Sequence, residues 1–328
     1  MTSADQPLVS VVISILNGEL YIEEAILSVL NQTYGELELI VINDGSTDKT
    51  ADVVQSTISR FSNRQITFVS RENRGMCRSL NEGLEISRGK YFAYVGADDI
   101  WAPKKLEIQV AELERTGDAA AFSDCLVINS SGEVQNRYGE KFPYHGGDIY
   151  QDLLWCKFQP ASPTNLFRRE TLDVVGNFDE SHIWEDRDMW IRIAKDNRVV
   201  YIDKPLASYR VHGKNGSATN MENIYKYGLQ SLDAAVRRDP SLVPIRRSLK
   251  AEIDAKQAGA YFETLQMGKA RHYAVKALLE RPANTGAWRS LLLSLFGAGL
   301  VSRIREKRRK NNYSNGLQVD REDHSANN

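Results

Sequence analysis

Short apolar runs alternate with amphipathic stretches over about the first 130 residues of the chain. The runs are rich in β-branched and aromatic residues, which favours buried strands, and the stretches between them have apolar residues at helical spacing. The expected strands cover residues 9–15, 37–42, 66–69, 90–96 and 120–128, with helices over 22–30, 51–58, 75–87 and 103–113. This order predicts parallel strands joined by right-handed crossovers, as in a doubly wound α/β sheet.

The pattern changes in the second part of the chain. Helices are expected at 170–175 and 184–196, followed by a strand at 199–211 that Pro205 interrupts and so places near a sheet edge. From residue 220 to about 300 the pattern is helical. We therefore expect an α/β domain over 1–215, a helical C-terminal region over 216–300, and a basic, polar tail over 301–328 that is disordered.

Composition narrows the class of protein. The 328 residues carry a formal net charge of −1, with 42% hydrophobic and 26% charged side chains, as in soluble globular proteins. The balanced charge argues against a nucleic acid partner. The three cysteines form no CxxC pair, which predicts neither a disulfide framework nor a zinc site and fits a reducing compartment. The sequence contains neither a secretory signal nor an apolar run of membrane-spanning length, so we expect a cytoplasmic protein.

Two adjacent carboxylates, Asp98 and Asp99, follow the expected strand at 90–96. Side chains alternate along a strand, so one carboxylate can hold a divalent cation while the other bonds a sugar or ribose hydroxyl. Ligands bind at this end of the strands in open α/β sheets, and carboxylate oxygens suit Mg²⁺ or Mn²⁺. The structural alternative is a helix cap, because Pro103 suits a first helical turn.

A second polar run, Asn-Asp-Gly-Ser-Thr-Asp at 43–48, ends the strand at 37–42. The carboxylate of Asp44 can accept the imide N–H of a uracil ring, and Gly45 permits a tight turn. The alternative is a strand–helix loop in which Ser46 or Asp48 caps the next helix.

Three arginines follow the strand at 66–69, at positions Arg71, Arg74 and Arg78. Their guanidinium groups suit the oxygens of a diphosphate, and the alternative for each is a solvated basic helix face.

Acids and tryptophans cluster at 184–190, where Trp184, Glu185 and Asp186 are consecutive. Either carboxylate can act as a general base toward an acceptor hydroxyl, and the spacing does not choose between them. The structural alternative is that the helix macrodipole favours acids in a first turn. His212 follows the last expected strand, and it either completes a metal site, contacts phosphate or has a structural role.

These segments, in this order, resemble family 2 glycosyltransferases of the GT-A fold. The resemblance covers about residues 8–215, and its strength lies in the register of the motifs rather than in any one of them. The motifs lie at 9–18, 21–34, 43–48, 98–99, 176–180 and 185–190, with Asn73 and Gly75, and Asn81 and Gly83, between them. The fold implied is a Rossmann-like GT-A domain with a helical C-terminal extension.

The resemblance implies an inverting transferase that takes a sugar from a nucleotide-diphosphate sugar, with a UDP-sugar as the expected donor. The acceptor would be a hydroxyl of a saccharide or a lipid-linked molecule, in cell-surface polysaccharide or glycolipid synthesis. Asp186 matches the family's catalytic base, and Asp99 and His212 match the ligands of a Mn²⁺ or Mg²⁺ cofactor. The implied substrate-binding residues are Asn17, Asp44, Arg71, Asn73, Arg78, Asp98, Trp184 and Glu185.

Three positions depart from the family's pattern. Ser14 and Leu16 stand where the family usually has Pro and Tyr, and Gly96 stands where many members have a further Asp. Two alternative functions are a non-catalytic nucleotide-sugar-binding protein and a nucleotidyltransferase on a related fold. The latter requires a glycine-rich phosphate loop directly after the first strand, where only Gly18 occurs.

The C-terminal region lies outside the resemblance. Apolar residues at 288–296 precede a cluster at 303–310 that has six basic residues against one Glu306. This arrangement predicts either association with a membrane surface through the basic segment, or a packing helix with a solvated basic tail.

Overall fold

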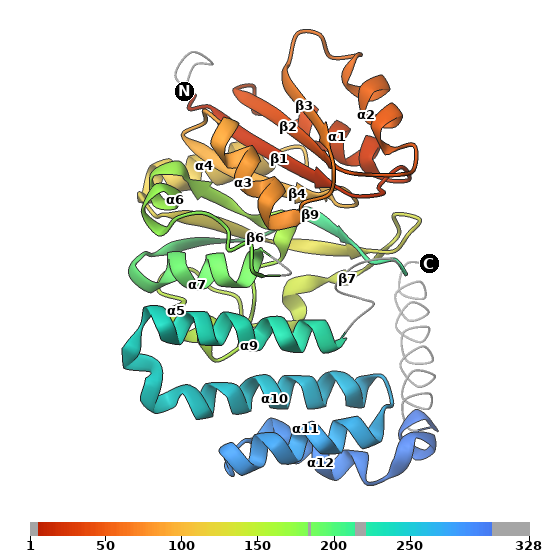
Figure 1. The fold of residues 1–328 in the computed structure, drawn as a ribbon, viewed down its shortest axis with the longest axis vertical. Helices are drawn as coiled ribbons and strands as arrows, with labels where there is room; N and C mark the ends of the chain where they lie inside the picture. Colours follow the sequence, from red (N-terminus) through yellow and green to blue (C-terminus); the bar gives the residue numbers. More distant parts are fainter. Residues whose placement is uncertain (1–5, 183–184, 214–220, 304–328) are drawn as a thin grey trace, which may run out of the picture. The chain divides into compact units, whose positions relative to one another are not determined.

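The computed structural model describes residues 6–182, 185–213 and 221–303, and the chain divides into two compact units after Pro240. In the described residues, the first unit holds one nine-stranded sheet with its covering helices, and the second unit is helical (Figure 1).

Four neighbouring strands form the parallel half of the sheet. Their order is β3 (Gln65–Arg71), β2 (Leu37–Asp44), β1 (Val9–Ile15) and β4 (Tyr91–Gly96), with parallel pairing throughout. Residues of β1 and β2 are almost wholly buried, as expected for parallel strands with helices on both faces. The doubly wound α/β half predicted from the apolar runs is confirmed.

The sheet continues from β4 with strands of mixed direction. The order is β8 (Leu166–Arg168), β6 (Ala120–Ile128), β9 (Val199–Arg210) and β5 (Ile100–Trp101), and β7 (Val134–Arg137) pairs with β6. Strand β8 is antiparallel to both of its neighbours, whereas β6 and β9 are parallel. Pro205 lies opposite Asp124, where the register of β6 and β9 shifts, and β9 lies next to the edge strand β5.

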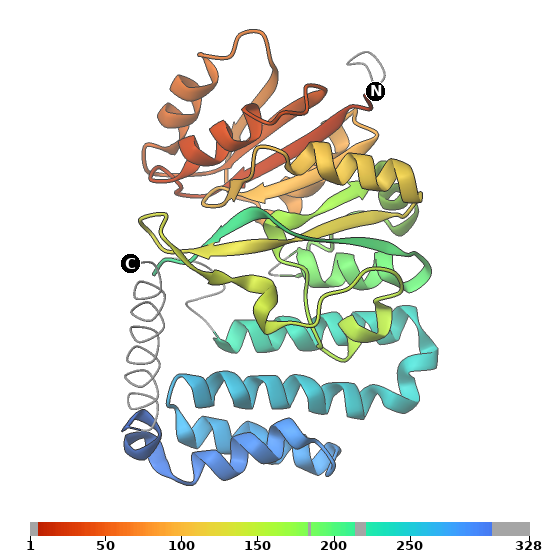
Figure 2. The ribbon, with the colours of Figure 1, turned by 180° about the vertical axis from the view of Figure 1, so that it is seen from behind.

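Helices cover both faces of the parallel half. Helices α1 (Ile22–Leu30), α2 (Thr50–Ile58) and α4 (Lys105–Thr116) share a hydrophobic cluster with the odd-numbered residues of β1. Helix α3 (Met76–Ile86) packs on the other face, where Gly83 lies against Val12. Figures 1 and 2 show α3 and α4 on opposite sides of the sheet.

The remaining helices of the first unit follow the mixed half of the sheet. They are α5 (Tyr150–Leu154), α6 (Arg169–Val175), α7 (Asp186–Asp196) and α9 (Met221–Arg238), with short 3-10 turns at Tyr138–Lys141 and Ser162–Thr164. Helix α9 packs on α7 and belongs to the first unit by its contacts. The domain limit between residues 215 and 216 stays a prediction, and this packing argues for a later limit.

The second unit contains α10 (Arg246–Glu263), α11 (Met267–Glu280) and α12 (Thr285–Ser294), after a 3-10 turn at Pro240–Ile245. Its small core is built on alanines, Ala255, Ala277 and Ala287. In the described ranges, no helix combines the length and the apolar character needed to cross a membrane.

Candidate active site

The parallel strands deliver three of the predicted site segments to one edge of the sheet. Ile15 of β1 pairs with Asn43 of β2, and Ser14 pairs with Gly96 of β4. The segments that begin at Asn17, Asp44 and Asp98 therefore leave the sheet side by side.

Asp44 is a buried carboxylate with protein donors on both oxygens. Oδ1 accepts from the Arg71 guanidinium and from the backbone N–H of Arg74 at 2.8 Å, and Oδ2 accepts from the N–H of Gly75 at 2.8 Å. At Gly45, φ is +83°, and a Cβ would lie 2.6 Å from the backbone nitrogen of Asn73. The run at 43–48 is thus fastened to the loop that starts α3.

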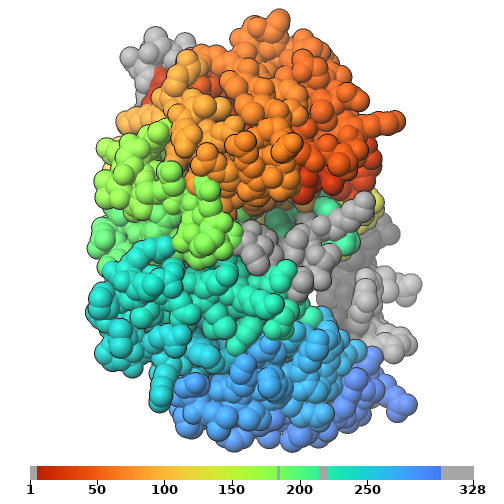
Figure 3. Space-filling view, in the orientation of Figure 1, coloured from red at the N-terminus to blue at the C-terminus, as the bar shows by residue number. Residues whose placement is uncertain are grey.

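The arginines predicted for a diphosphate are engaged with carboxylates. Arg71 bridges Asp44 and Glu82, with Nε 2.7 Å from the Glu82 carboxylate. The guanidinium of Arg78 lies 3.2 Å from Glu180. In the space-filling view, the orange surface around α3 meets the green surface of the segment after α6, where Glu180 lies (Figure 3). The charges of Arg71 and Arg78 are therefore partly neutralised by carboxylates of the protein itself, a feature that sequence reasoning missed.

Asn17 joins the first two segments. Its side-chain Oδ1 accepts from the N–H of Thr47 at 2.9 Å, and its own N–H donates to Ser46 Oγ at 2.9 Å. Asn17 has a φ of +55°, a conformation that Asn adopts more readily than most residues. The role of Asn17 in this structure is to hold the loop after β1 against the loop after β2.

The two carboxylates after β4 have different surroundings. Asp99 is buried, and its Oδ1 accepts from the backbone N–H of Arg210 at 2.9 Å. Asp98 is half-buried, and its Oδ2 lies 3.0 Å from Nε2 of His212. Burial, and then the charge of the neighbouring Asp98, raises the pKa of Asp99, although the hydrogen bond and the charge of Arg210 act to lower it.

Arg210 was not predicted as a site residue, although it organises this turn. Its buried guanidinium donates from Nε to the backbone oxygen of Asp98 at 2.8 Å and pairs with Glu24 of α1. The guanidinium also lies over the ring of Tyr21, 4.6 Å from its centroid. No local pattern marks this role, because Arg210 lies 111 positions from Asp99 in the sequence.

Glu185 and Asp186 lie at the start of α7 in a mostly buried setting. Ser162 Oγ donates to Glu185 at 3.1 Å, and Asp186 Oδ1 accepts from the N–H of Arg187 at 2.6 Å and from the Tyr227 hydroxyl at 3.3 Å. Burial, and then the charge of Asp186, raises the pKa of Glu185 to about 7. Burial also raises the pKa of Asp186.

Glu185 is connected to β4, the strand that leads into Asp98 and Asp99. Glu185 lies close enough to Asp99 for its charge to raise the pKa of the Asp99 carboxyl. Ser162, which holds Glu185, is tied through Asn165 to the backbone of Tyr94 in β4, with two hydrogen bonds of 3.0 Å. Trp184, predicted to bind substrate, lies outside the described residues.

Comparison with known sequences places the chain in a family. The sequence profile of glycosyl transferase family 2 matches residues 10–176. An uncharacterized glycosyltransferase of Haemophilus influenzae is 34% identical over 223 residues, which are 65% of this chain and 68% of that protein. An uncharacterized glycosyltransferase of Methanocaldococcus jannaschii is 30% identical over 230 residues, 68% of this chain and 78% of that protein.

The chain belongs to glycosyl transferase family 2. The resemblance read from the motifs is therefore confirmed, and with it the transfer of a sugar from a nucleotide sugar.

Solved structures support the GT-A fold of this family 2 glycosyltransferase. Staphylococcus aureus TarS residues 1–349, in complex with UDP-GlcNAc, has a TM-score of 0.62 at 16% identity, over 87% of this chain and 89% of that one. The mannosyltransferase PcManGT of Pyrobaculum calidifontis, in complex with GDP-Man and Mn²⁺, has a TM-score of 0.58 at 21% identity, over 91% and 87% of the two chains. At these identities the likeness shows the fold.

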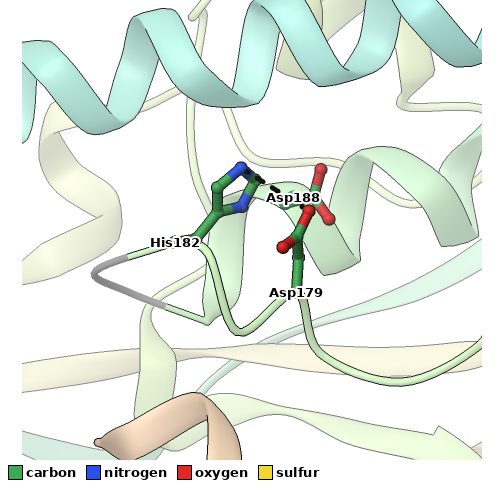
Figure 4. Close-up of side chains that lie close together, drawn as sticks. All are labelled: Asp179, His182 and Asp188. Atoms are coloured by element: carbon green, nitrogen blue, oxygen red, sulfur yellow. Dashed lines mark ion pairs between the residues drawn. The ribbon is translucent and has the colours of Figure 1, made fainter.

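Two groups of side chains in this glycosyltransferase have the composition of a cation site. The first is Asp179, His182 and Asp188, whose ligand atoms lie within 4.8 Å of one another (Figure 4). However, Asp188 is paired with Arg192 at 3.0 Å and with Arg238 at 2.6 Å. Two guanidinium groups already balance the two carboxylates, so this group fits an ion-pair network better than a metal site.

The second group, Asp98, Asp99 and His212, fits a cation at the carboxyl end of β4. A Cβ added to Gly96 would lie 2.8 Å from Asp99 Oδ2 and 2.9 Å from Asp98 Oδ1, so the glycine leaves a cradle beside both carboxylates. Carboxylate oxygens with one imidazole are a suitable ligand set for Mn²⁺ or Mg²⁺.

Proposed function

We propose that this family 2 glycosyltransferase is an inverting enzyme that moves a sugar from a UDP-sugar to a hydroxyl of a saccharide or lipid-linked acceptor. Such a reaction would serve cell-surface polysaccharide or glycolipid synthesis, and the cytoplasmic location expected from the sequence belongs to the same proposal. The observation that carries it is the chain of hydrogen bonds from Glu185 through Ser162 and Asn165 to Tyr94 of β4, the strand that leads into Asp98 and Asp99.

Asp186 is the proposed catalytic base. Its Oδ1 is held by the N–H of Arg187 and the hydroxyl of Tyr227, which orients the carboxylate and favours its ionised form. Burial, and then the charge of Asp186, raises the pKa of Glu185 to about 7. In this assignment Asp186 takes the proton of the acceptor hydroxyl as that oxygen attacks the anomeric carbon, while Glu185 contacts the substrate.

The donor would lie along the edge formed by the loops after β1, β2 and β3. Asp44 and Asn17 shape the base pocket, with Asn73 on the loop before α3. Arg71 and Arg78 are proposed to face the diphosphate, although each already pairs with a carboxylate. Because both pairs are formed within the protein, we expect their contribution to leaving-group stabilisation to be smaller than that of unpaired arginines.

A divalent cation, Mn²⁺ or Mg²⁺, is the proposed cofactor, and when bound it would supply positive charge at the departing diphosphate. The contacts favour Asp98 with His212 as its ligands, since Asp99 Oδ1 already accepts from Arg210. The sequence predicted Asp99 and His212 as the cation ligands and Asp98 as a substrate-binding residue, and this assignment moves the ligand role from Asp99 to Asp98. Asp99 would then fix the turn that presents Asp98.

The base assignment is tested with Asp186→Asn. Loss of a general base typically lowers kcat by about 10²- to 10⁴-fold, while the donor should bind as in the wild-type enzyme. Donor affinity is measured by calorimetry and transfer by product formation. Asp173→Asn, at an exposed carboxylate of α6, is the control and should change neither. Near-normal transfer by Asp186→Asn would contradict the assignment, and loss in Glu185→Gln alone would move the role to Glu185.

The donor and cofactor are tested with a panel of UDP-, GDP- and dTDP-sugars in thermal unfolding, with and without Mn²⁺. A ligand at 100 times its Kd stabilises the folded state by about 2.7 kcal/mol. We expect UDP-sugars to give the largest shift, and only with the cation. A protein that binds a nucleotide sugar but never cleaves it would be the non-catalytic alternative.

A further inference from the structure

Helix α12 of the second unit buries small residues and exposes several large apolar ones. The residues it buries are small, namely Ala287, Ser290 and Ser294. Four large apolar residues of the helix and of the turn after it, Trp288, Leu292, Leu295 and Phe296, are 46% to 61% exposed, whereas Leu291 and Leu293 are half-buried. A soluble packing helix shows the opposite arrangement.

The exposed apolar residues of α12 and of the turn after it share a helical spacing. Positions 288, 292, 295 and 296 are spaced as on one side of a helix. We name Trp288, Leu292, Leu295 and Phe296 the α12 outer face. Contiguous exposed apolar groups of this size mark an interaction surface rather than a random surface position.

The chemistry of Trp288 suits burial in an apolar layer. Its indole Nε1–H donates to the backbone oxygen of Pro282 at 2.8 Å. The ring can therefore enter an apolar phase without carrying an unpaired donor, whose burial is costly. Tryptophan, phenylalanine and leucine are the residues that insert into the headgroup region of a bilayer.

The charge of the neighbouring sequence indicates which kind of partner binds the α12 outer face. The sequence that begins seven positions after Phe296, 303–310, carries six basic residues against one Glu306, in a chain with a net charge of −1. A second copy of this chain would bring a second basic cluster with it, and the two clusters would repel each other. An anionic lipid surface is attractive, because each Lys or Arg near it contributes to binding.

We propose that the α12 outer face docks on a membrane surface that contains anionic lipids, and that the positive charge of the sequence at 303–310 adds to the attraction. The proposal is independent of the donor, acceptor and catalytic base assigned above. It commits to a lipid surface, and a protein partner or a second copy of the chain are outcomes that the test distinguishes.

The test is flotation of the full-length protein with vesicles of phosphatidylcholine alone and of equal parts phosphatidylcholine and phosphatidylglycerol. We expect binding to the mixed vesicles only, weakened by high salt. Leu292→Ser with Phe296→Ser should weaken binding roughly tenfold or more, because two inserted apolar side chains are lost. Replacing Arg308, Arg309 and Lys310 with Gln should also weaken binding. Val174→Ser, at an exposed apolar residue of α6, is the matched control and should bind as wild type.

A second readout does not depend on the variants' folding. Mixed vesicles should shift the tryptophan emission of the wild-type protein to shorter wavelength, and Trp288→Phe should abolish most of this shift. The proposal is overturned if the protein ignores both kinds of vesicle, or if the Leu292→Ser, Phe296→Ser variant binds unchanged. It is equally overturned if light scattering shows a dimer that this variant disperses while vesicles bind neither protein.

Discussion

At position 96 the absence of a side chain leaves room for two carboxylates. A Cβ there would come within 3 Å of an oxygen of both Asp98 and Asp99, and real Cβ atoms essentially never approach so closely. Gly96 therefore belongs to the proposed cation site, because its missing side chain leaves space for both carboxylates.

Gly96→Ala should therefore push one carboxylate out of place. We expect the affinity for Mn²⁺ in the presence of a UDP-sugar to fall roughly tenfold or more, as overpacking of this kind costs about 1–3 kcal/mol. The affinity is measured by titrating Mn²⁺ in thermal unfolding. Gly35→Ala is the control, because a Cβ at Gly35 meets nothing within 4 Å. Equal Mn²⁺ affinity in both variants would rule out the cradle.

Glu185 links catalysis to stability through its pKa. Folding raises this pKa from its ordinary value of 4.5 to about 7, so the folded chain binds the proton more tightly than the unfolded chain. The free energy of unfolding therefore decreases as the pH rises through this window, and the penalty is complete above pH 7.

Glu185→Gln removes that titration. The variant should gain stability relative to wild type as the pH rises from 4.5 toward 8, with little difference at the acid end. Urea unfolding over this pH range is the measurement, with Glu170→Gln at an exposed carboxylate as control. A difference between Glu185→Gln and wild type that stays constant with pH would contradict the assigned burial and coupling.

At the residue scale, the sequence predicted which residues stand out as site candidates better than it predicted which residues they contact. The motif at 43–48 singled out Asp44, but its pairing with Arg71 depends on β2 and β3 lying side by side. Tyr227 lies 41 positions from Asp186 and Arg210 lies 111 from Asp99, so no local pattern connects them. Both were missed for that reason.

At the scale of elements, α3 depends on a single glycine for its distance from the sheet. A Cβ at Gly83 would lie 2.7 Å from both γ-methyl groups of Val12 in β1. The close contact of Gly83 is therefore with the sheet. Asn81 of the same helix hydrogen-bonds the backbone of Phe178, which fixes α3 against the segment after α6.

Gly83→Ala should destabilise the protein by about 1–3 kcal/mol, because the methyl group forces α3 away from β1. Gly259→Ala in α10 is a matched helical control with open space around it. That variant should gain up to about 1 kcal/mol from helix propensity. Chemical unfolding measures both, and similar effects of the two substitutions would show that α3 is not packed this closely.

The elements themselves divide into predictable and unpredictable ones. Long apolar runs and helical spacing identified β1, β2, β4, α1 and α3, since burial on both faces leaves a clear pattern. Strands β5 and β8 are only two and three residues long and exist through their partners. Local sequence carries too little information to specify such short antiparallel pairings.

At the scale of the molecule, α9 decides where the catalytic unit ends. It supplies Tyr227 to Asp186 and Arg238 to Asp188, so a chain cut at residue 215 loses two groups that hold the start of α7. The domain limit expected from the sequence, at residue 215, was placed where the resemblance to the family ends. Tyr227 and Arg238 lie beyond that limit, and no motif in the sequence marks them as partners of α7.

Truncation separates the two limits. A chain of residues 1–240 should keep Mn²⁺-dependent binding of the UDP-sugar and lose vesicle binding, because it lacks α12 and the basic segment. A chain of residues 1–215 should unfold at a lower temperature and lose transfer activity. Thermal unfolding and the transfer assay measure both, and full activity of the 1–215 chain would restore the earlier limit.

Cys156 gives the catalytic unit a natural attachment point for a reporter group. It is the one cysteine of the three that is not buried, and its sulfur lies 3.2 Å from the guanidinium of Arg187, next to the proposed base. A thiol-directed fluorophore would therefore label this position in the unmodified protein. Its emission would follow the start of α7 in real time as donor and acceptor arrive, without any engineered cysteine.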